Sequence, residues 1–138
     1  MRNSIKEERI EYGTPEAGGV LWKAFDRSRI ELDMKPSEVS RLLGIKLPTI
    51  EGWKKKGSIH QENKSNDRLP QRIEVVYTFI AIFRSLAAVF SSRDDRRQWM
   101  FTKNLHFEGQ SPFDYASKSL NNLFVLNTYL NFRRGVGV

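Results

Sequence analysis

The feature that most constrains the fold is one uninterrupted apolar run. Residues 73–90 read IEVVYTFIAIFRSLAAVF and contain neither glycine nor proline across eighteen positions. Strands are usually about 3–10 residues long, so a run of this length is predicted to be a helix, although Val, Ile, Tyr and Phe favour strands. Glu74 and Arg84 argue against a membrane span. A helix apolar on nearly all sides is buried on several sides, and we expect another subunit or a partner to supply some of that burial.

The segments on either side of this run are also read as helices, so the sequence predicts an all-α fold. Trp22 and Phe25 belong to an amphipathic helix and are expected to lie in the core, with Leu32 and Met34 closing over its end. Further apolar patterns follow the long run. Helices are expected over residues 20–32, 93–101 and 120–134, with another that starts near Pro112.

Composition divides the chain into four segments. Residues 1–19 are polar and end in Gly and Pro, and we expect a flexible arm there. Residues 20–58 are predicted to form a helix-turn-helix DNA-binding unit. Residues 59–70 are rich in Gly, Ser, Asn and charge, which is typical of a linker. Residues 71–138 are predicted to form a second small helical unit.

The helix-turn-helix prediction comes from residues 36–56, PSEVSRLLGIKLPTIEGWKKK. Two short helices can cross steeply if a small side chain lies at their closest approach and a glycine lies in the turn. Ser40 and Gly44 meet those needs. Pro48 suits the first turn of the second helix. Apolar residues at Val39, Leu43, Ile45, Ile50 and Trp53 are predicted to fill the space between the two helices.

The basic character of the chain favours a polyanionic partner or an acidic protein surface. Its net charge is +7 and its pI is near 9.9. An ordinary helical hairpin with a solvated basic end would satisfy the same loose pattern. If the unit binds DNA, Lys54, Lys55 and Lys56 are expected to contact phosphates while Lys46, Thr49 and Glu51 approach base edges, with Ser37 and Leu47 completing the surface.

The sequence indicates no catalytic, metal or cofactor site. It contains no cysteine and two histidines, and it lacks a Gly-rich phosphate loop, which together argue against an enzyme. His60 and His106 stand without a second ligand. Asp94 and Asp95 lie between arginines, so we expect one of them to cap a short helix in a solvated turn. The N-terminus has no apolar signal segment, and a cytoplasmic location is expected.

The order of segments resembles the Xre/MbcA/ParS antitoxin family. A helix-turn-helix, a linker and an apolar helix precede the pattern W-x(4)-N-x(4)-G-x-x-P, which is carried here by Trp99, Asn104, Gly109 and Pro112. The last helix then closes on Arg133-Arg134-Gly135. In arrangement, the resemblance covers about residues 20–135.

The resemblance implies an antitoxin that dimerises, binds its own promoter and holds a toxin with its C-terminal unit. In this family the toxin is typically a RES-domain protein that consumes NAD, and the antitoxin's C-terminal end covers or enters its active site. No cofactor of the antitoxin itself is implied. The implied toxin-binding residues are Trp99, Asn104, Gly109, Pro112, Tyr129, Arg133, Arg134, Gly135 and Val136.

Two other functions fit the residues. A stand-alone dimeric repressor, phage-like in its sequence after Trp53, would use the C-terminal unit only to dimerise. A protein-interaction adaptor would keep the helical hairpin without binding DNA. A toxin gene beside this one would separate the first from an antitoxin, and a mobility-shift experiment would separate the second.

Overall fold

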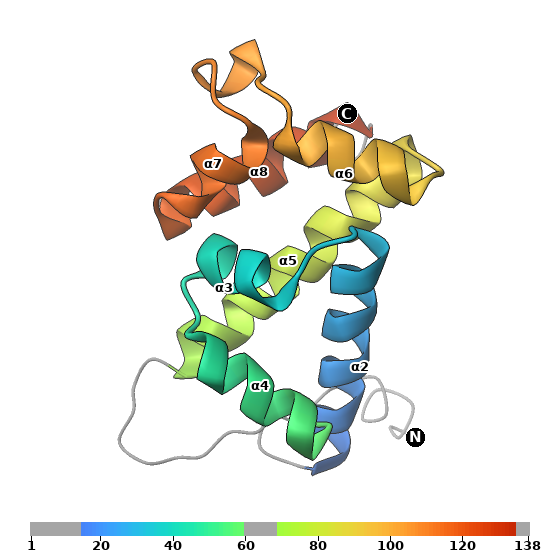
Figure 1. The fold of residues 1–138 in the computed structure, drawn as a ribbon, viewed down its shortest axis with the longest axis vertical. Coiled ribbons are helices and arrows are strands. Elements are labelled where there is room, and N and C mark those ends of the chain that lie inside the picture. Colours follow the sequence, from blue (N-terminus) through green and yellow to red (C-terminus); the bar gives the residue numbers. More distant parts are fainter. Residues whose placement is uncertain (1–14, 60–68, 135–138) are drawn as a thin grey trace, which may run out of the picture.

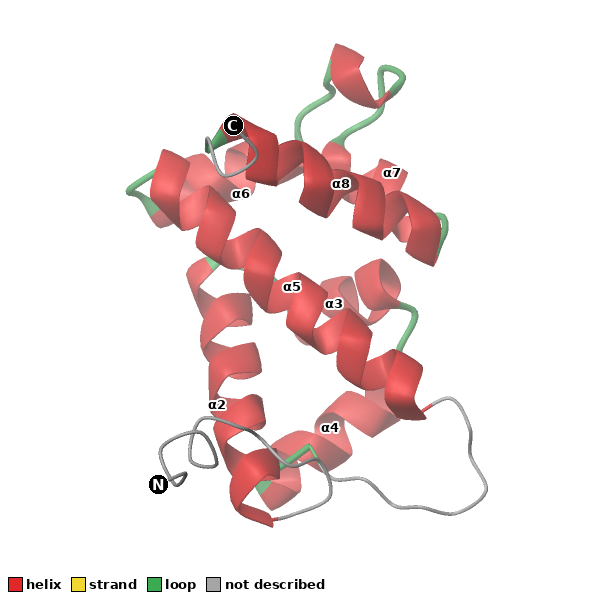
Figure 2. Ribbon diagram, turned by 180° about the vertical axis from the view of Figure 1, so that it is seen from behind, coloured by secondary structure: helices red, strands yellow, loops and turns green. Residues whose placement is uncertain are grey.

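The computed structural model describes residues 15–59 and 69–134, and every regular element within those ranges is helical (Figures 1 and 2). This confirms the predicted all-α fold. The elements are α2 (Pro15–Glu31), α3 (Pro36–Leu43), α4 (Leu47–Lys56), α5 (Leu69–Val89), α6 (Arg93–Phe101), the 3-10 turn η1 (Leu105–Phe107), α7 (Pro112–Ser117) and α8 (Leu120–Arg133).

The long helix α5 connects the two halves of the fold. In Figure 1 it runs diagonally between α2, α3 and α4 at one end of the molecule and α6, α7 and α8 at the other. Phe79 of α5 is fully buried and its ring centroid lies 5.5 Å from that of Phe25 on α2. Near the other end of α5, the Ser85 hydroxyl donates to the Asn131 side chain of α8 at 3.5 Å. The core is therefore continuous across the predicted linker.

Burial of α5 limits one expectation from the sequence. Most of its large apolar side chains are buried by this chain itself, so the expectation that another subunit or a partner supplies some of the burial stays a prediction for the side chains that remain accessible. Val89 at its C-terminal end is 37% exposed. Among the described helices, none is by itself long and apolar enough to cross a membrane, and α5 and α6 are bent by 117° relative to each other. The buried apolar residues of α5 are Ile73, Val75, Val76, Phe79, Ile80, Ile82 and Leu86.

The first helix begins earlier than predicted, because two glycines that suggested a loop belong to it. α2 begins at Pro15, so residues 15–19 are helical and not part of an arm. Gly18 is buried where α2 meets the segment after α4, and its carbonyl accepts a 3.1 Å hydrogen bond from the Ile59 N–H. A Cβ atom at this position would lie 2.8 Å from the Ile59 carbonyl oxygen. Gly18 thus permits close approach of two backbones.

The boundaries of the predicted linker also differ from those in the structure. α5 begins at Leu69, inside the segment 59–70, and Ile59 is buried in the core. Residues 1–14, 60–68 and 135–138 lie outside the described part of the chain. The rest of the proposed arm and linker, including His60, therefore stay predictions.

Serine residues cap the helices of the C-terminal half. The Ser92 hydroxyl accepts a 3.0 Å hydrogen bond from the Asp95 N–H at the start of α6, so the prediction that Asp94 or Asp95 is the cap was wrong. Ser111 and Ser119 do the same for α7 and α8. Serine is a preferred N-cap, and both aspartates instead occupy the first turn, where the helix dipole favours a negative charge.

Alanine substitutions at the two adjacent glycines test this packing. Gly18→Ala is expected to lower the free energy of unfolding by about 1–3 kcal/mol, because the new methyl group must displace a backbone carbonyl. Gly19→Ala is the matched control, since its Cβ would meet only the Gly57 oxygen at 3.8 Å. Alanine is the better helix former by roughly 0.5–1 kcal/mol, so this variant should unfold at equal or higher urea concentration. Equal stability of the two variants would contradict the close approach.

Candidate functional site

The α3–α4 pair has the local structure that its sequence predicts. Residues 44–46 form the turn, with Gly44 in the left-handed region at φ 70° and its N–H bonded to the Ser40 carbonyl at 2.9 Å. The Ser40 hydroxyl also donates to the Ile45 carbonyl at 2.7 Å. Ser40 therefore ties the turn together by hydrogen bonding. The expectation that Val39, Leu43, Ile45, Ile50 and Trp53 are buried is confirmed.

The predicted DNA-binding residues lie mainly in solvent. Leu47 and Thr49 are partly buried, and the others are exposed. The lysines occupy the last turn of α4, where the helix dipole also favours positive charge. Gly52 lies in the middle of α4, and a Cβ atom there would meet nothing within 4 Å. The exposed members of the set are Ser37, Lys46, Glu51, Lys54, Lys55 and Lys56.

A buried arginine joins three helix ends beside this pair. Arg96 of α6 has a side chain that is 7% exposed. Its guanidinium donates at 3.0 Å to the Glu31 carbonyl, to the Glu31 carboxylate and to the Phe90 carbonyl. The ends of α2 and α5 are thereby fastened to α6. The sequence had suggested a solvated turn for this arginine-rich segment, which is wrong for Arg96 because its partners come from distant parts of the chain.

The next residue fastens α6 to the start of α3. Arg97 makes two hydrogen bonds of 3.0 Å with the two Glu38 carboxylate oxygens, and its guanidinium lies 4.2 Å from the centre of the Phe101 ring. Glu38 also accepts a 2.9 Å hydrogen bond from the Lys35 N–H and so caps α3. Hydrogen bonding from Arg97 is the main cause that lowers the pKa of Glu38 below its ordinary value of 4.5.

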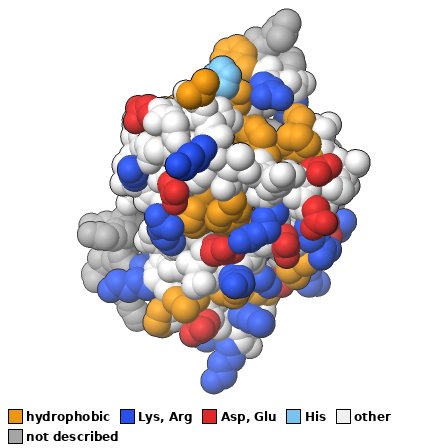
Figure 3. Space-filling view, turned by 45° about the horizontal axis from the view of Figure 1, so that its top comes forward, with side chains coloured by type: hydrophobic (Ala, Val, Ile, Leu, Met, Phe, Trp, Pro, Cys, Tyr) orange, Lys and Arg blue, Asp and Glu red, His pale blue; other side chains and the backbone are white. Residues whose placement is uncertain are grey.

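Charged side chains of both signs also lie on the surface of the molecule. Figure 3 shows Lys and Arg side chains interspersed with Asp and Glu across the middle of one face. Arg93 pairs with Glu31 at 3.4 Å, and Arg41 pairs with Asp114 at 3.2 Å. No group of three or more His, Asp or Glu in the described part of the chain could hold a metal ion.

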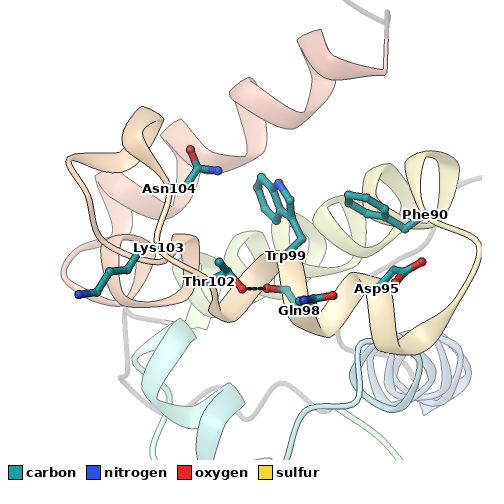
Figure 4. Close-up of a pocket in the computed structure, with 7 residues that line it drawn as sticks. All are labelled: Phe90, Asp95, Gln98, Trp99, Thr102, Lys103 and Asn104. Atoms are coloured by element: carbon teal, nitrogen blue, oxygen red, sulfur yellow. Dashed lines mark hydrogen bonds between the residues drawn. The ribbon is translucent and has the colours of Figure 1, made fainter.

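The side of α6 that faces away from the Arg96 and Arg97 contacts borders a cavity around Trp99. Figure 4 shows Trp99 beside the cavity, with Phe90 and Asp95 toward one end and Lys103 at the other. Trp99 stacks on Tyr129 of α8, with centroids 6.4 Å apart and planes inclined by 14°. The cavity has a volume of about 460 Å³ and is lined by Phe90, Asp95, Gln98, Trp99, Thr102, Lys103 and Asn104.

The loop after α6 depends on two of the predicted toxin-binding residues. The Asn104 side chain accepts a 2.9 Å hydrogen bond from the His106 N–H, and the Asn104 carbonyl accepts one from the Gly109 N–H at 3.2 Å. Gly109 has φ 78°, a conformation that favours glycine. Pro112 is buried in the first turn of α7. Asn104 and Gly109 shape the loop directly, and Pro112 is buried where the loop ends and α7 begins.

The structure brings together some of the predicted toxin-binding residues. Trp99 and Asn104 line one cavity, while Arg133 donates to the Tyr129 hydroxyl at 3.1 Å. Arg134 is exposed at the end of α8. Gly135 and Val136 lie outside the described residues. Sequence reasoning missed Phe90, Asp95 and Lys103 as cavity residues. The four-residue spacing of Asp95 and Trp99 places those two on one face of α6, whereas Lys103 lies beyond the end of that helix.

Comparison with known proteins identifies the class of this region. Residues 85–122, which contain α6, the loop and α7, match the model of a toxin-binding domain. That domain is the C-terminal toxin-binding domain of Xre/MbcA/ParS antitoxins, and the match covers 38 of the 138 residues. The family predicted from the sequence is thus confirmed, and the match supports an antitoxin role. No curated protein sequence matches the chain significantly.

The contact between Arg97 and Glu38 predicts a pH-dependent stability difference. Because the folded-state pKa of Glu38 is lowered, its charge stabilises the fold above pH 4.5, and this contribution is lost as the pH falls through the folded-state pKa. Glu38→Gln should therefore lower the free energy of unfolding by about 1 kcal/mol at pH 7. The difference from the wild type should shrink toward zero in acid, as measured by urea unfolding across pH.

Asp114→Asn is the control for this experiment. Its ion pair with Arg41 has side chains that are 62% and 50% exposed on the arginine and the aspartate, so little stability should depend on it. A Glu38→Gln effect that is the same at pH 7 and at pH 3 would contradict the electrostatic account.

Proposed function

We propose that this protein is the antitoxin of a type II toxin–antitoxin pair, which neutralises its toxin and represses its own operon. The observation that carries the proposal is the match of residues 85–122 to an antitoxin toxin-binding domain. In this proposal the protein is a homodimer in the cytoplasm. The C-terminal half holds the toxin and the α3–α4 pair binds operator DNA.

The proposed partner is a RES-domain toxin that consumes NAD. This part of the proposal comes from the family resemblance. Neutralisation would work by occlusion, with the toxin's active site covered by α8 and the chain after it. Arg133 and Arg134 lie exposed at the end of α8, where they suit contacts with the carboxylates of an acidic surface.

Operator binding is supported by the outer surface of α4. Its last turn carries three exposed lysines, which suit contacts with phosphates. Gly52 adds a second argument, because glycine inside a helix costs roughly 0.5–1 kcal/mol relative to alanine. Since an added Cβ would meet no atom of this chain within 4 Å, packing does not explain the glycine. A surface without a side chain allows close approach of the helix to another molecule, which here would be DNA.

Co-expression tests the antitoxin role. The toxin gene beside this one should arrest growth when expressed alone, and co-expression of this protein should restore growth, with the two proteins copurifying. Rescue without NAD depletion in the arrested cells would retain the antitoxin role but reject the RES-type toxin. A toxic neighbour that is neither bound nor neutralised would reject the antitoxin role and leave the stand-alone repressor.

Replacing the three lysines tests the DNA-binding role. The triple variant Lys54→Ala, Lys55→Ala and Lys56→Ala should bind the upstream DNA more weakly, and its affinity should depend less steeply on salt, by a slope of about 1 per lost phosphate contact. Mobility shift at several salt concentrations measures both effects. Toxin neutralisation should be unchanged.

The matched control removes equal charge elsewhere. Lys23→Ala, Arg84→Ala and Lys118→Ala are exposed changes on α2, on α5 and after α7. They should leave the salt slope near that of the wild type. A second variant, Gly52→Ala, should raise helix stability while it weakens DNA binding. Identical slopes for both triple variants would reject α4 as the DNA-contacting helix.

A further inference from the structure

The cavity around Trp99 lies on one face of α6, and side chains of the opposite face contact the end of α2 and the start of α3. Asp95, Gln98, Trp99 and Thr102 recur at intervals of three or four residues, so they share one side of the helix. Arg96 and Arg97 point to the other side, toward α2 and α3. The whole cavity falls within residues 85–122, the segment that matches a toxin-binding domain.

The aromatic wall of the cavity is held in place from behind. Trp99 stacks on Tyr129 and meets the edge of Phe107, whose ring centroid is 6.1 Å away at 89°. The backbone of Phe90, on the other wall, accepts a hydrogen bond from Arg96 and donates one to the Leu86 carbonyl at 2.7 Å. A wall that is already ordered loses little conformational freedom on binding, which favours affinity.

The two ends of the cavity carry opposite charges. Asp95 and Lys103 are both exposed, and neither forms an ion pair with another described residue. Asp95 lies in the first turn of α6 and Lys103 lies two residues beyond the last residue of that helix, so the two charges are at opposite ends of it. Figure 4 shows Trp99 between them, with Lys103 extending away from Phe90. A ligand whose charges complement both ends can therefore bind in only one orientation along the cavity.

We propose that this cavity docks a segment of the toxin that inserts one large apolar side chain between Phe90 and Trp99. The segment places a basic residue against Asp95 and an acidic residue against Lys103. The inference rests on the proposed antitoxin function and specifies which surface of the protein holds the toxin. Charge complementarity at both ends gives specificity, and the aromatic centre gives affinity.

Charge reversal in the full-length protein tests the cavity. Asp95→Lys and Lys103→Glu should each weaken binding of the purified cognate toxin on the order of tenfold, because each places like charges together. Isothermal titration measures the affinity, and growth rescue measures neutralisation. Gln98→Trp, which fills the cavity without changing charge, should weaken binding as well. Operator binding by all of these variants should stay within about twofold of the wild type.

Two charge-reversal variants at residues outside the cavity serve as matched controls. Asp94→Lys makes the same charge change in the same first turn of α6 but outside the cavity, and Lys118→Glu reverses an exposed lysine beyond α7. Both should bind toxin within about twofold of the wild type. Thermal unfolding of each variant verifies that it is folded.

The outcomes separate the cavity from the proposed function. If the wild type neutralises the toxin and the cavity variants bind it as tightly as their controls do, the cavity proposal is overturned while the antitoxin function stands. If the wild type does not bind the toxin, the antitoxin function itself fails. If the variants change the protein's own oligomeric state with unchanged toxin affinity, a second copy of this chain occupies the cavity, and the proposal is likewise overturned.

Discussion

The buried guanidinium of Arg96 is the contact on which the arrangement of the two halves depends. A charge removed from water is costly unless it is paired and hydrogen-bonded. Here the cost is offset by the Glu31 carboxylate and by the carbonyls of Glu31 and Phe90, all at 3.0 Å. Those acceptors belong to the C-terminal ends of α2 and α5, where helices leave unsatisfied carbonyl groups. One side chain therefore satisfies the ends of two helices and sets the position of a third.

This contact makes α6 the link between the two candidate binding surfaces. Its inner side holds the start of α3 through Arg97 and Glu38, and its outer side borders the cavity at Trp99. Trp99 and Arg97 belong to the same short, capped helix. A rotation of α6 that moved Trp99 would therefore also pull Arg97 away from Glu38. The fold thus gives the cavity at which we propose that the toxin docks and the start of α3 a common mechanical element.

Local patterns in the sequence predicted most of the helices and much of the core. Phe25 and Trp53 are buried as their spacing indicated, and their rings meet at 5.9 Å. Long-range contacts were not predictable in the same way. Gly18 was assigned to a loop because the contact that requires a glycine there is made with Ile59, which follows two further helices in the sequence. Likewise, the burial of Arg96 depends on Glu31, and nothing near either residue in the sequence indicates the other.

The difference between local patterns and long-range contacts also explains what the family motif could reveal about the site. Asn104 and Gly109 form the loop through their own hydrogen bonds and backbone angles, and Pro112 is buried at the start of α7. Trp99 alone among the motif's four residues presents an aromatic wall to the cavity. These motif residues reflect what the loop needs in order to fold, whereas in the proposed docking mode the choice of partner depends on side chains outside the motif. The charges of Asp95 and Lys103 lie outside the motif, and neither residue forms an ion pair with another described residue.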